Sequence, residues 1–317
     1  MALHLITGGA GFIGSSIAET LLAQGERVRI LDDFSSGRRE NVEGLRAAGS
    51  RLEVVEGTIV DAETVAGAMK GVEVVFHEAA IPSVARSVED PQAAVLVGVQ
   101  GTTVVLDEAR RAGVKRVVFA ASSAAYGDAP ASPKVETMAP QPLSPYAASK
   151  LAGEQLMRVF AGLYAIETVS LRYFNIFGPR QDPKSEYAAV VPRFIMAVLR
   201  RERPIVFGDG EQTRDFCFVD NAVKANLLAA STPRKLKGEV VNVGCGQKTS
   251  LNQLLATLGD LSRVRVDADY RAARPGDIRD SMADVGAARA LLSYEPAIDV
   301  QEGLRRTFGA FAAAAKK

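Results

Sequence analysis

Near its start the chain reads Leu3-His4-Leu5-Ile6-Thr7-Gly8-Gly9-Ala10-Gly11-Phe12-Ile13-Gly14. The apolar run Leu3 to Thr7 is typical of a buried strand, and a segment of helical period, Phe12 to Gln24, follows it directly. Gly8, Gly11 and Gly14 lie where strand gives way to helix. Their missing side chains allow a tight turn, close approach of a pyrophosphate and close packing of the helix on the strand. The stretch therefore predicts a strand, glycine loop and helix that bind a dinucleotide.

Apolar strands and helices go on alternating through the first half of the chain, which indicates a parallel sheet covered on both faces. The fold class is therefore α/β, with a doubly wound parallel sheet. The further strands are expected at Arg27 to Leu31, Leu52 to Glu56, Val72 to Phe76, Arg116 to Ala121 and Thr168 to Arg172, and the further helices at Asp61 to Lys70, Pro91 to Ala112 and Tyr146 to Tyr164.

The alternation weakens after Arg172. A helix is expected at Val190 to Arg201, a strand at Glu239 to Val243 and a helix at Leu251 to Leu258. We therefore expect a dinucleotide-binding domain over residues 1–172, with returning segments around 215–245. A smaller, mixed α/β C-terminal lobe that binds substrate is expected over residues 173–317.

An acidic residue accompanies the glycine loop. Asp32 ends the second predicted strand, where a carboxylate accepts the adenosine ribose hydroxyls of a dinucleotide. This favours NAD over NADP, because the carboxylate would repel a 2′-phosphate. Arg38 and Arg39 are a counter-signal, since an arginine there can accept that phosphate. We give Asp32 more weight and interpret the arginines as solvated.

Tyr146 and Lys150 stand four residues apart, and Ser122-Ser123 precede them. On a helix this spacing puts the phenol and the ammonium on one face, where the cation favours phenolate and lowers a tyrosine pKa from about 10. Tyr146 is thus a candidate base. A lone pair with this spacing is common on helix surfaces, but together with the glycine loop it indicates a redox site.

Composition limits the class of partner. The chain has 317 residues, 38 Lys and Arg against 37 Asp and Glu, so no strong field draws it to nucleic acid or to an anionic membrane. A small-molecule partner is expected. The first strand begins almost at Met1, and no apolar run approaches the roughly 18 residues of a membrane span. We therefore expect a cytoplasmic protein.

The cysteines and histidines stand in unrelated contexts. Cys217 and Cys245 supply no disulfide framework, and with His4 and His77 they show no metal-ligand spacing. We interpret all four as structural and expect no metal site.

The combined motifs resemble the extended short-chain dehydrogenase/reductases that act on nucleotide sugars, nearly end to end. Within that group the chain is most similar to UDP-sugar 4-epimerases, above all to bacterial UDP-N-acetylglucosamine 4-epimerases. The resemblance implies a Rossmann fold, a homodimer, and a tightly bound NAD recycled in each turnover. Besides the glycine loop and Tyr146-x-x-x-Lys150, the motifs are His77-Glu78-Ala79-Ala80, Ser122-Ser123-x-x-Tyr126-Gly127, Arg172-Tyr173-Phe174-Asn175, Phe207-Gly208-Asp209-Gly210, Thr213-Arg214-Asp215-Phe216, Asn242-Val243-Gly244 and Arg274-Pro275-Gly276-Asp277.

The resemblance also implies roles for single residues. Tyr146 would act as base and acid, Lys150 would bind the nicotinamide ribose and lower the tyrosine pKa, and Ser122 would bond the sugar O4 with help from Ser123. Further cofactor contacts would come from Gly8, Gly11, Phe12, Ile13, Gly14, Asp32, Asp33, Ser36, Gly37, Thr58, Ile59, Ala79, Ala80 and Tyr173.

The same resemblance implies a substrate site. Arg214 precedes the apolar run Phe216 to Val219, where an unpaired cation would be costly, so an anionic ligand is expected there. Implied contacts are Asn175, Arg214 and Arg274 to the diphosphate, Asp277 to the uridine ribose, Ala189, Val190 and Phe207 to the uracil, and Ser83 and Ser281 near the sugar. A small residue at Ser281 would admit an N-acetyl group.

Two positions depart from the family pattern. Thr58 stands in Gly57-Thr58-Ile59 where relatives usually have Asp near the adenine amino group, and a hydroxyl accepts more weakly than a carboxylate. Gly98 stands where relatives commonly have Asn, which would loosen local packing. Neither change removes a group that the chemistry requires.

The reaction expected from the resemblance is oxidation at C4 followed by reduction from the other face, which inverts C4. Related 4,6-dehydratases and UDP-glucuronate decarboxylases carry carboxylates where this chain has Ala124-Ala125. These two activities are the alternatives within the class. An NAD-binding sensor or scaffold is the alternative outside it, although such proteins usually lack the Tyr or the Lys.

Overall fold

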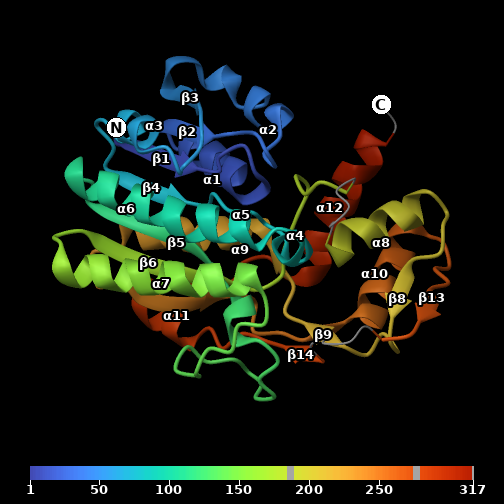
Figure 1. The fold of residues 1–317 in the computed structure, drawn as a ribbon. Coiled ribbons are helices and arrows are strands. Elements are labelled where there is room, and N and C mark those ends of the chain that lie inside the picture. The colour runs from blue at the N-terminus through green and yellow to red at the C-terminus, as the bar shows by residue number, and fades with distance from the viewer. Residues whose placement is uncertain (184–188, 274–278, 316–317) are drawn as a thin grey trace.

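A computed structural model describes residues 1–183, 189–273 and 279–315. Its centre is a seven-stranded sheet in the order β11-β6-β5-β4-β1-β2-β3, in which every pair is parallel (Figure 1). The predicted doubly wound parallel sheet is confirmed. Its strands are β1 (Leu3–Thr7), β2 (Arg27–Asp32), β3 (Leu52–Glu56), β4 (Val74–His77), β5 (Arg116–Ser122), β6 (Glu167–Tyr173) and β11 (Glu239–Val243).

Alternate residues of each strand face opposite layers of helices, as the two-residue repeat of a strand requires. On β1, Leu3 and Leu5 join one hydrophobic cluster and Ile6 joins the other. One layer contains α3 (Ala62–Ala68), α6 (Thr102–Arg111) and α7 (Pro145–Leu163), and the other contains α1 (Phe12–Ala23), α9 (Val219–Ser231) and α11 (Gly286–Leu292). The remaining short elements on this side of the molecule are α2 (Arg39–Glu43), the 3₁₀ turn η1 (Arg46–Arg51) and α4 (Val84–Glu89).

The prediction of one continuous α-helix over Pro91 to Ala112 is wrong in the middle of that range. The structure has α5 (Pro91–Val95), one wide π-helical turn η2 (Leu96–Gly101) and then α6. Gly98 lies in this turn, and a Cβ there would come within 2.6 Å of the Ser149 hydroxyl. The expectation of loose packing at Gly98 is therefore also wrong, since Ser149 fills the space that a side chain would occupy.

The C-terminal lobe is built from short strands and longer helices (Figure 1). Its two- and three-residue strands form small sheets beside the large one. The helices are α8 (Val190–Leu199), α10 (Leu251–Ser262) and α12 (Val300–Ala314), and the strands are β7 (Ile176–Phe177) with β10 (Cys217–Phe218), β8 (Ile205–Phe207) with β13 (Asp269–Arg271), and β9 (Thr213–Arg214) between β12 (Thr249–Ser250) and β14 (Asp280–Ser281).

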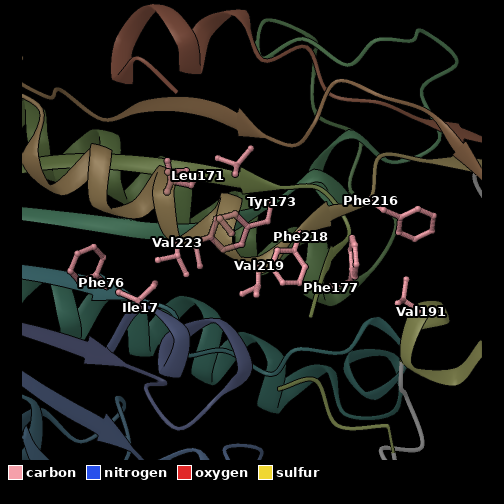
Figure 2. Packing of buried hydrophobic residues seen from close by; sticks show 14 of the residues in the cluster. Ile17, Phe76, Leu171, Tyr173, Phe177, Val191, Phe216, Phe218, Val219 and Val223 are labelled. Atoms are coloured by element: carbon pink, nitrogen blue, oxygen red, sulfur yellow. The ribbon is translucent and has the colours of Figure 1, made fainter. Parts of the chain in front are cut away.

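One hydrophobic cluster joins this lobe to the large sheet. Figure 2 shows Ile17 of α1 next to Phe76 of β4, with Phe177, Phe216 and Val191 continuing the same packing toward the lobe. The two parts share a core and are not separated by a polar interface. No helix in the described parts of the chain is long and apolar enough to cross a membrane.

The two cysteines are neighbours in space, so the prediction of unrelated contexts is wrong. A side-chain hydrogen bond joins Cys217 and Cys245, and the Tyr294 hydroxyl lies 4.0 Å from the Cys217 sulfur. The reason is a tertiary contact: Cys245 follows β11, and its amide donates to the carboxylate of Asp215, which lies two residues before Cys217. Both are free thiols.

Candidate active site

The glycine loop forms a cradle between β1 and α1. Gly8 has φ of +70°, and a Cβ there would lie 2.7 Å from the backbone of Ala79, so only glycine fits without a shift. Gly11 caps α1 with no side-chain bond to the first turn. The amides of that turn are thus available to an anion, as a pyrophosphate site requires.

Asp32 lies at the end of β2 with its carboxylate already oriented. Its two oxygens accept hydrogen bonds from the amides of Ala10 and Phe34, each at 2.8 Å. Burial nevertheless raises its pKa. A Cβ on Gly37 would lie 2.6 Å from the same carboxylate, so the absence of a side chain lets this loop pack directly against the acid.

Arg38 and Arg39, the two arginines that could accept the 2′-phosphate of NADP, both have acidic partners. Arg39 pairs with Glu56 at 2.7 Å and stacks over Phe34, while Arg38 pairs with Glu40 at 3.5 Å. Arg38 also lines the cavity described next. Their interpretation as simply solvated is therefore incomplete.

A cavity of about 770 Å³ opens over the carboxyl ends of β1, β2 and β4. Its lining contains the predicted cofactor residues apart from Tyr146, Lys150 and Tyr173, together with Ala189 of the predicted uracil site. The lining residues shared with the prediction are Gly8, Gly11, Phe12, Ile13, Gly14, Asp32, Asp33, Ser36, Gly37, Thr58, Ile59, Ala79 and Ala80. A backbone cradle, an exposed helix start and an oriented carboxylate in one cavity fit a dinucleotide.

The predicted catalytic residues lie on neighbouring elements. Ser122 ends β5, and its hydroxyl accepts from the Ala124 amide at 3.2 Å as the chain enters the short 3₁₀ turn η3 (Ser123–Tyr126). Ser144 and Pro145 start α7, which carries Tyr146 and Lys150. A hydrogen bond joins the Tyr146 phenol to Ser122, so the structure brings the predicted serine and tyrosine together.

The electrostatics differ from the prediction. Burial raises the pKa of Tyr146, opposed by the hydrogen bond from Ser122 and reinforced by the charge of Glu78. Burial also lowers the pKa of Lys150 to about 8, and its ammonium donates to the Ala120 carbonyl at 2.7 Å. The pKa of Tyr146 in the protein alone is therefore raised and not lowered, because desolvation of the phenol is the largest effect, and the influence of Lys150 on it stays a prediction.

Glu78 is a site residue that the sequence analysis did not assign. It follows β4, lines the cavity, and accepts a hydrogen bond from the Tyr173 hydroxyl at 2.8 Å. Burial raises its pKa to about 7, while Tyr173 and Lys150 act in the opposite direction. The sequence feature that could have indicated a role for Glu78 is its place in His77-Glu78-Ala79-Ala80, at the end of a buried strand.

A buried ion pair supports the catalytic helix from behind. Arg172 on β6 forms a bidentate pair with Glu154 on α7, at 2.8 and 2.7 Å. The guanidinium also lies over the ring of Tyr126, whose hydroxyl donates to Asn242 on β11 at 2.7 Å. Strands β6 and β11 are thereby tied to the helix that carries Tyr146.

Two residues of the predicted substrate site, Arg214 and Ser281, lie on β9 and β14. Ser281 pairs in register with Arg214 and is 9% exposed, so it lies in a buried strand and not in a surface turn. Arg214 donates to the carbonyls of Thr213 and Arg279, at 2.8 and 3.4 Å. The premise that its cation would lack partners is wrong.

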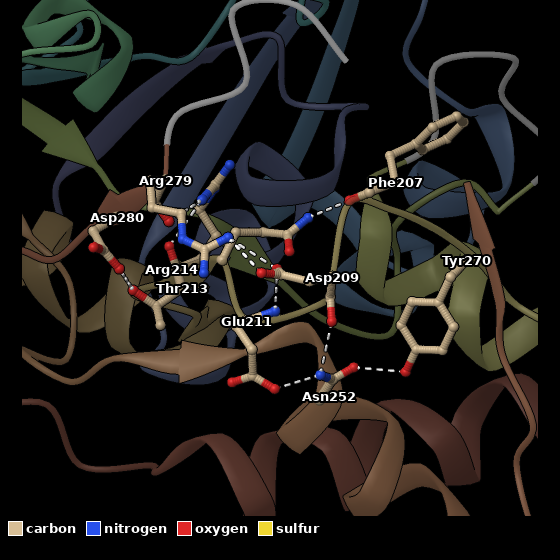
Figure 3. A network of polar contacts seen from close by, with 10 residues as sticks. Phe207, Asp209, Glu211, Thr213, Arg214, Asn252, Tyr270, Arg279 and Asp280 are labelled. Atoms are coloured by element: carbon tan, nitrogen blue, oxygen red, sulfur yellow. Dashed lines mark hydrogen bonds and ion pairs between the residues drawn. The ribbon is translucent and has the colours of Figure 1, made fainter. Parts of the chain in front are cut away.

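Figure 3 shows the polar network around these strands. Arg279 forms a bidentate ion pair with Asp209, which belongs to the loop after Phe207. Thr213 bonds Asp280 on the neighbouring strand. The network links the predicted uracil wall at Phe207 to the strand that carries Ser281.

The remaining predicted substrate residues have varied surroundings. The Asn175 amide donates to the Asp215 carbonyl at 3.3 Å, Ser83 caps α4, and Ala189 and Val190 start α8. Arg274 and Asp277 lie outside the described residues. The Asp215 carboxylate, not predicted to have a role, binds the amides of Cys245, Gly246 and Ala283 at 2.8–3.0 Å.

Comparison with known proteins agrees with this geometry. The model of the NAD-dependent epimerase/dehydratase family matches residues 4–244. The UDP-glucose 4-epimerase of Mycolicibacterium smegmatis is 40% identical over 305 residues, 96% of each chain. The structure of the UDP-N-acetylglucosamine 4-epimerase of Methanobrevibacter ruminantium, in complex with UDP-N-acetylmuramic acid, has a TM-score of 0.93 at 37% identity and covers 99% of both chains. The Thermus thermophilus UDP-glucose 4-epimerase in complex with NAD has a TM-score of 0.88 at 35% identity, over 98% of this chain and 99% of that one.

The chain therefore belongs to the NAD-dependent epimerase/dehydratase family. Within that family it stands with the UDP-sugar 4-epimerases, as its motifs predicted, and its cofactor is NAD.

Proposed function

We propose that this protein interconverts UDP-N-acetylglucosamine with UDP-N-acetylgalactosamine, and also UDP-glucose with UDP-galactose. The observation that carries the proposal is Ser281, a small buried residue directly opposite Arg214. If Arg214 binds the diphosphate, the next group of the substrate, the hexose, lies near this strand. A serine there leaves room for an N-acetyl group in either orientation of the sugar.

The chemistry follows from the groups at the ends of β5 and α7. NAD, when bound, supplies the group that takes up a hydride from C4 and returns it. Tyr146 removes the O4 proton during oxidation and restores it during reduction. The Ser122 hydroxyl, which is bonded to the Tyr146 phenol, would also bond the sugar O4. The Lys150 ammonium stabilises negative charge as it develops on the phenol. Between the two half-reactions the 4-keto sugar rotates in the site, so that hydride returns to the other face of C4.

The neighbouring side chains favour epimerisation over the alternatives within the class. Ala124 and Ala125 follow Ser122 in η3, and Ala125 is fully buried. Neither can serve as the acid or base that elimination of water requires. Oxidation and re-reduction at C4 need only Ser122, Tyr146 and Lys150, and no further proton donor in η3.

The decisive experiment incubates the protein, without added NAD, with UDP-glucose, UDP-N-acetylglucosamine, UDP-glucuronate and dTDP-glucose. Products are identified by chromatography and NMR. We expect C4 epimers of the first two substrates, and none from the Tyr146→Phe variant. A 4-keto-6-deoxy sugar would indicate a dehydratase, and a UDP-pentose a decarboxylase. Bound NAD without turnover of any of the four would favour a sensor or scaffold.

We also propose a homodimer. Large apolar side chains are exposed on α7 and on the neighbouring α5 and η2, with Leu163 71%, Val95 51% and Leu96 44% exposed. Burial of such residues stabilises association. Light scattering during size-exclusion chromatography tests this directly, and a mass of 33.7 kDa, that of one chain, would contradict it.

A further inference from the structure

One carboxylate in the redox site has no role in the mechanism above. Glu78 follows β4, and its amide donates to the Thr7 carbonyl on β1 at 3.1 Å. The next residue, Ala79, packs against Gly8 of the cradle. The backbone of Glu78 is thus fixed between the glycine loop and the sheet, while its side chain lines the cavity.

A chain of hydrogen bonds orients this carboxylate. The Tyr173 hydroxyl donates to Oε1 of Glu78 at 2.8 Å and accepts from the Asn226 amide at 2.6 Å. Asn226 is itself fixed on α9, because the same amide donates to the Ala222 carbonyl at 2.9 Å. Residues from β4, β6 and α9 therefore cooperate to place one acid at the cavity wall.

The ionisable groups that interact with Glu78 come from two elements, α7 and β6. Tyr173, which bonds Glu78, stands in register with Ser122, and Ser122 bonds Tyr146. Helix α7 thus brings Tyr146 and Lys150 to the same end of the sheet, where the charge of Glu78 acts on both. Strand β6 contributes Tyr173, which keeps its proton because burial and Glu78 raise its pKa far above the ordinary value. His77, the residue before Glu78 on β4, bonds Thr7 and Thr102, and burial keeps it neutral by lowering its pKa to about 3. Behind Lys150, Glu154 adds a second negative charge, already paired with Arg172.

We propose that Glu78 is a positioning residue that sets the pH range in which Tyr146 and Lys150 hold the charges required for proton transfer. Its anionic form favours the ammonium of Lys150 and disfavours the phenolate of Tyr146. Because one carboxylate acts on both groups, both ionisations move together when it is removed. The effect on turnover rests on the proposed function, whereas the effect on the two ionisations does not.

The test replaces Glu78 by Gln, whose amide oxygen still accepts from Tyr173 but carries no charge. We expect both limbs of the kcat/KM profile against pH to move to lower pH by about one unit, the effect typical of one nearby charge. Ionisation of Tyr146 is measured separately, from the ultraviolet absorbance of phenolate in the NAD-loaded protein. The same titration of the Tyr146→Phe variant is subtracted, which leaves the contribution of Tyr146. Its midpoint is expected to fall by the same amount in Glu78→Gln.

Three variants complete the test. Glu73→Gln makes the same change at the exposed residue just before β4 and should leave both measurements unchanged. Glu78→Asp keeps the charge, so both limbs of its kcat/KM profile should stay close to the wild-type pH values. Glu78→Leu removes the charge without burying an amide, and repeats the test if Glu78→Gln does not fold.

The two measurements separate the possible failures. An unchanged phenolate midpoint in both neutral variants would overturn the proposal, and so would limbs that move in opposite directions. Absence of turnover on any UDP-sugar would contradict the proposed function, yet the phenolate titration would still decide the role of Glu78. A loss of activity with unmoved limbs would mean that Glu78 acts only by holding Tyr173.

Discussion

The half of the molecule that holds the cofactor and the lobe that faces the substrate are built differently. The first rests on strands of four to seven residues in one parallel sheet, with its glycine loop packed directly against the backbone of Ala79. The second uses strands of two or three residues paired in small separate sheets, with side-chain contacts such as Arg279–Asp209 around them. The first arrangement fixes the glycine cradle through the backbone, while in the second we propose that substrate choice depends on single side chains such as Ser281.

Their ion pairs show the same contrast. Glu154 and Arg172 are 1% and 4% exposed, whereas Asp209 and Arg279 are 56% and 61% exposed. Loss of one partner from a buried pair leaves a charge without solvent, but an exposed pair exchanges one partner for water. We therefore expect substitutions in the first region to affect stability and catalysis, and those in the second to affect selectivity.

The largest change expected is one of selectivity, from Ser281→Tyr. A phenol ring in place of the buried hydroxyl should exclude the N-acetyl group and abolish the acetylated reaction, while UDP-glucose and UDP-galactose still interconvert. Rates on both substrate pairs, measured in parallel, check this. Turnover of acetylated sugars by the variant, or a wild type limited to the smaller pair, would contradict the assignment of Ser281.

Tyr146→Phe should lower kcat by about 100-fold to 10,000-fold, the range for loss of a general acid-base group. Bound NAD should remain, because the cradle and Asp32 are unchanged. Turnover assays and mass analysis of the extracted nucleotide measure the two properties independently. Near-normal turnover would show that another group moves the O4 proton.

Glu154→Ala should lower the free energy of unfolding by about 3–5 kcal/mol, the cost of leaving one partner of a buried pair uncompensated. Urea denaturation measures it. Asp209→Asn is the matched control in the substrate lobe, and its denaturation midpoint should stay close to that of the wild type. Equal losses in both variants would remove the contrast between the two regions.

Asp32→Asn should weaken NAD binding by about tenfold to a hundredfold, since hydrogen bonds to a charged group contribute roughly 1.5–3 kcal/mol. Discrimination against NADP should fall as well, because the repulsion of a 2′-phosphate is lost. Titration calorimetry with both nucleotides on the cofactor-stripped protein compares the two affinities. An unchanged preference for NAD would assign the discrimination to other residues, with Arg38 the first to examine.

Much of the first region could be predicted from sequence because its signals are local. The strands at Leu3–Thr7, Leu52–Glu56 and Glu239–Val243 have the predicted bounds. The glycine loop and Asp32 share one cavity, as the motif spacing required. The π-helical turn at Leu96–Gly101 could not be predicted, because apolar periodicity continues through it and the close contact of Gly98 with Ser149 is a tertiary one.

The electrostatics of the site could not be predicted from spacing. The four-residue separation correctly put Tyr146 and Lys150 on one helix, but the sign of the tyrosine pKa shift depends on burial, which spacing does not give. The role of Glu78 depends on Tyr173 and Asn226, which reach it from β6 and α9. The two-residue strands around Ser281 are too short for any periodic pattern.

The position of β11 also matters while the protein is being synthesised. Residues 239–243 form the edge of the large sheet next to β6, yet they follow β7 to β10 and helices α8 and α9 in the chain. On the ribosome β6 therefore lacks its outer neighbour until residue 243 has left the exit tunnel. An unpaired strand of this kind is a template for pairing with other chains. The nascent chain is most prone to aggregation in this interval, so a truncation before residue 239 should be far less soluble than the full protein.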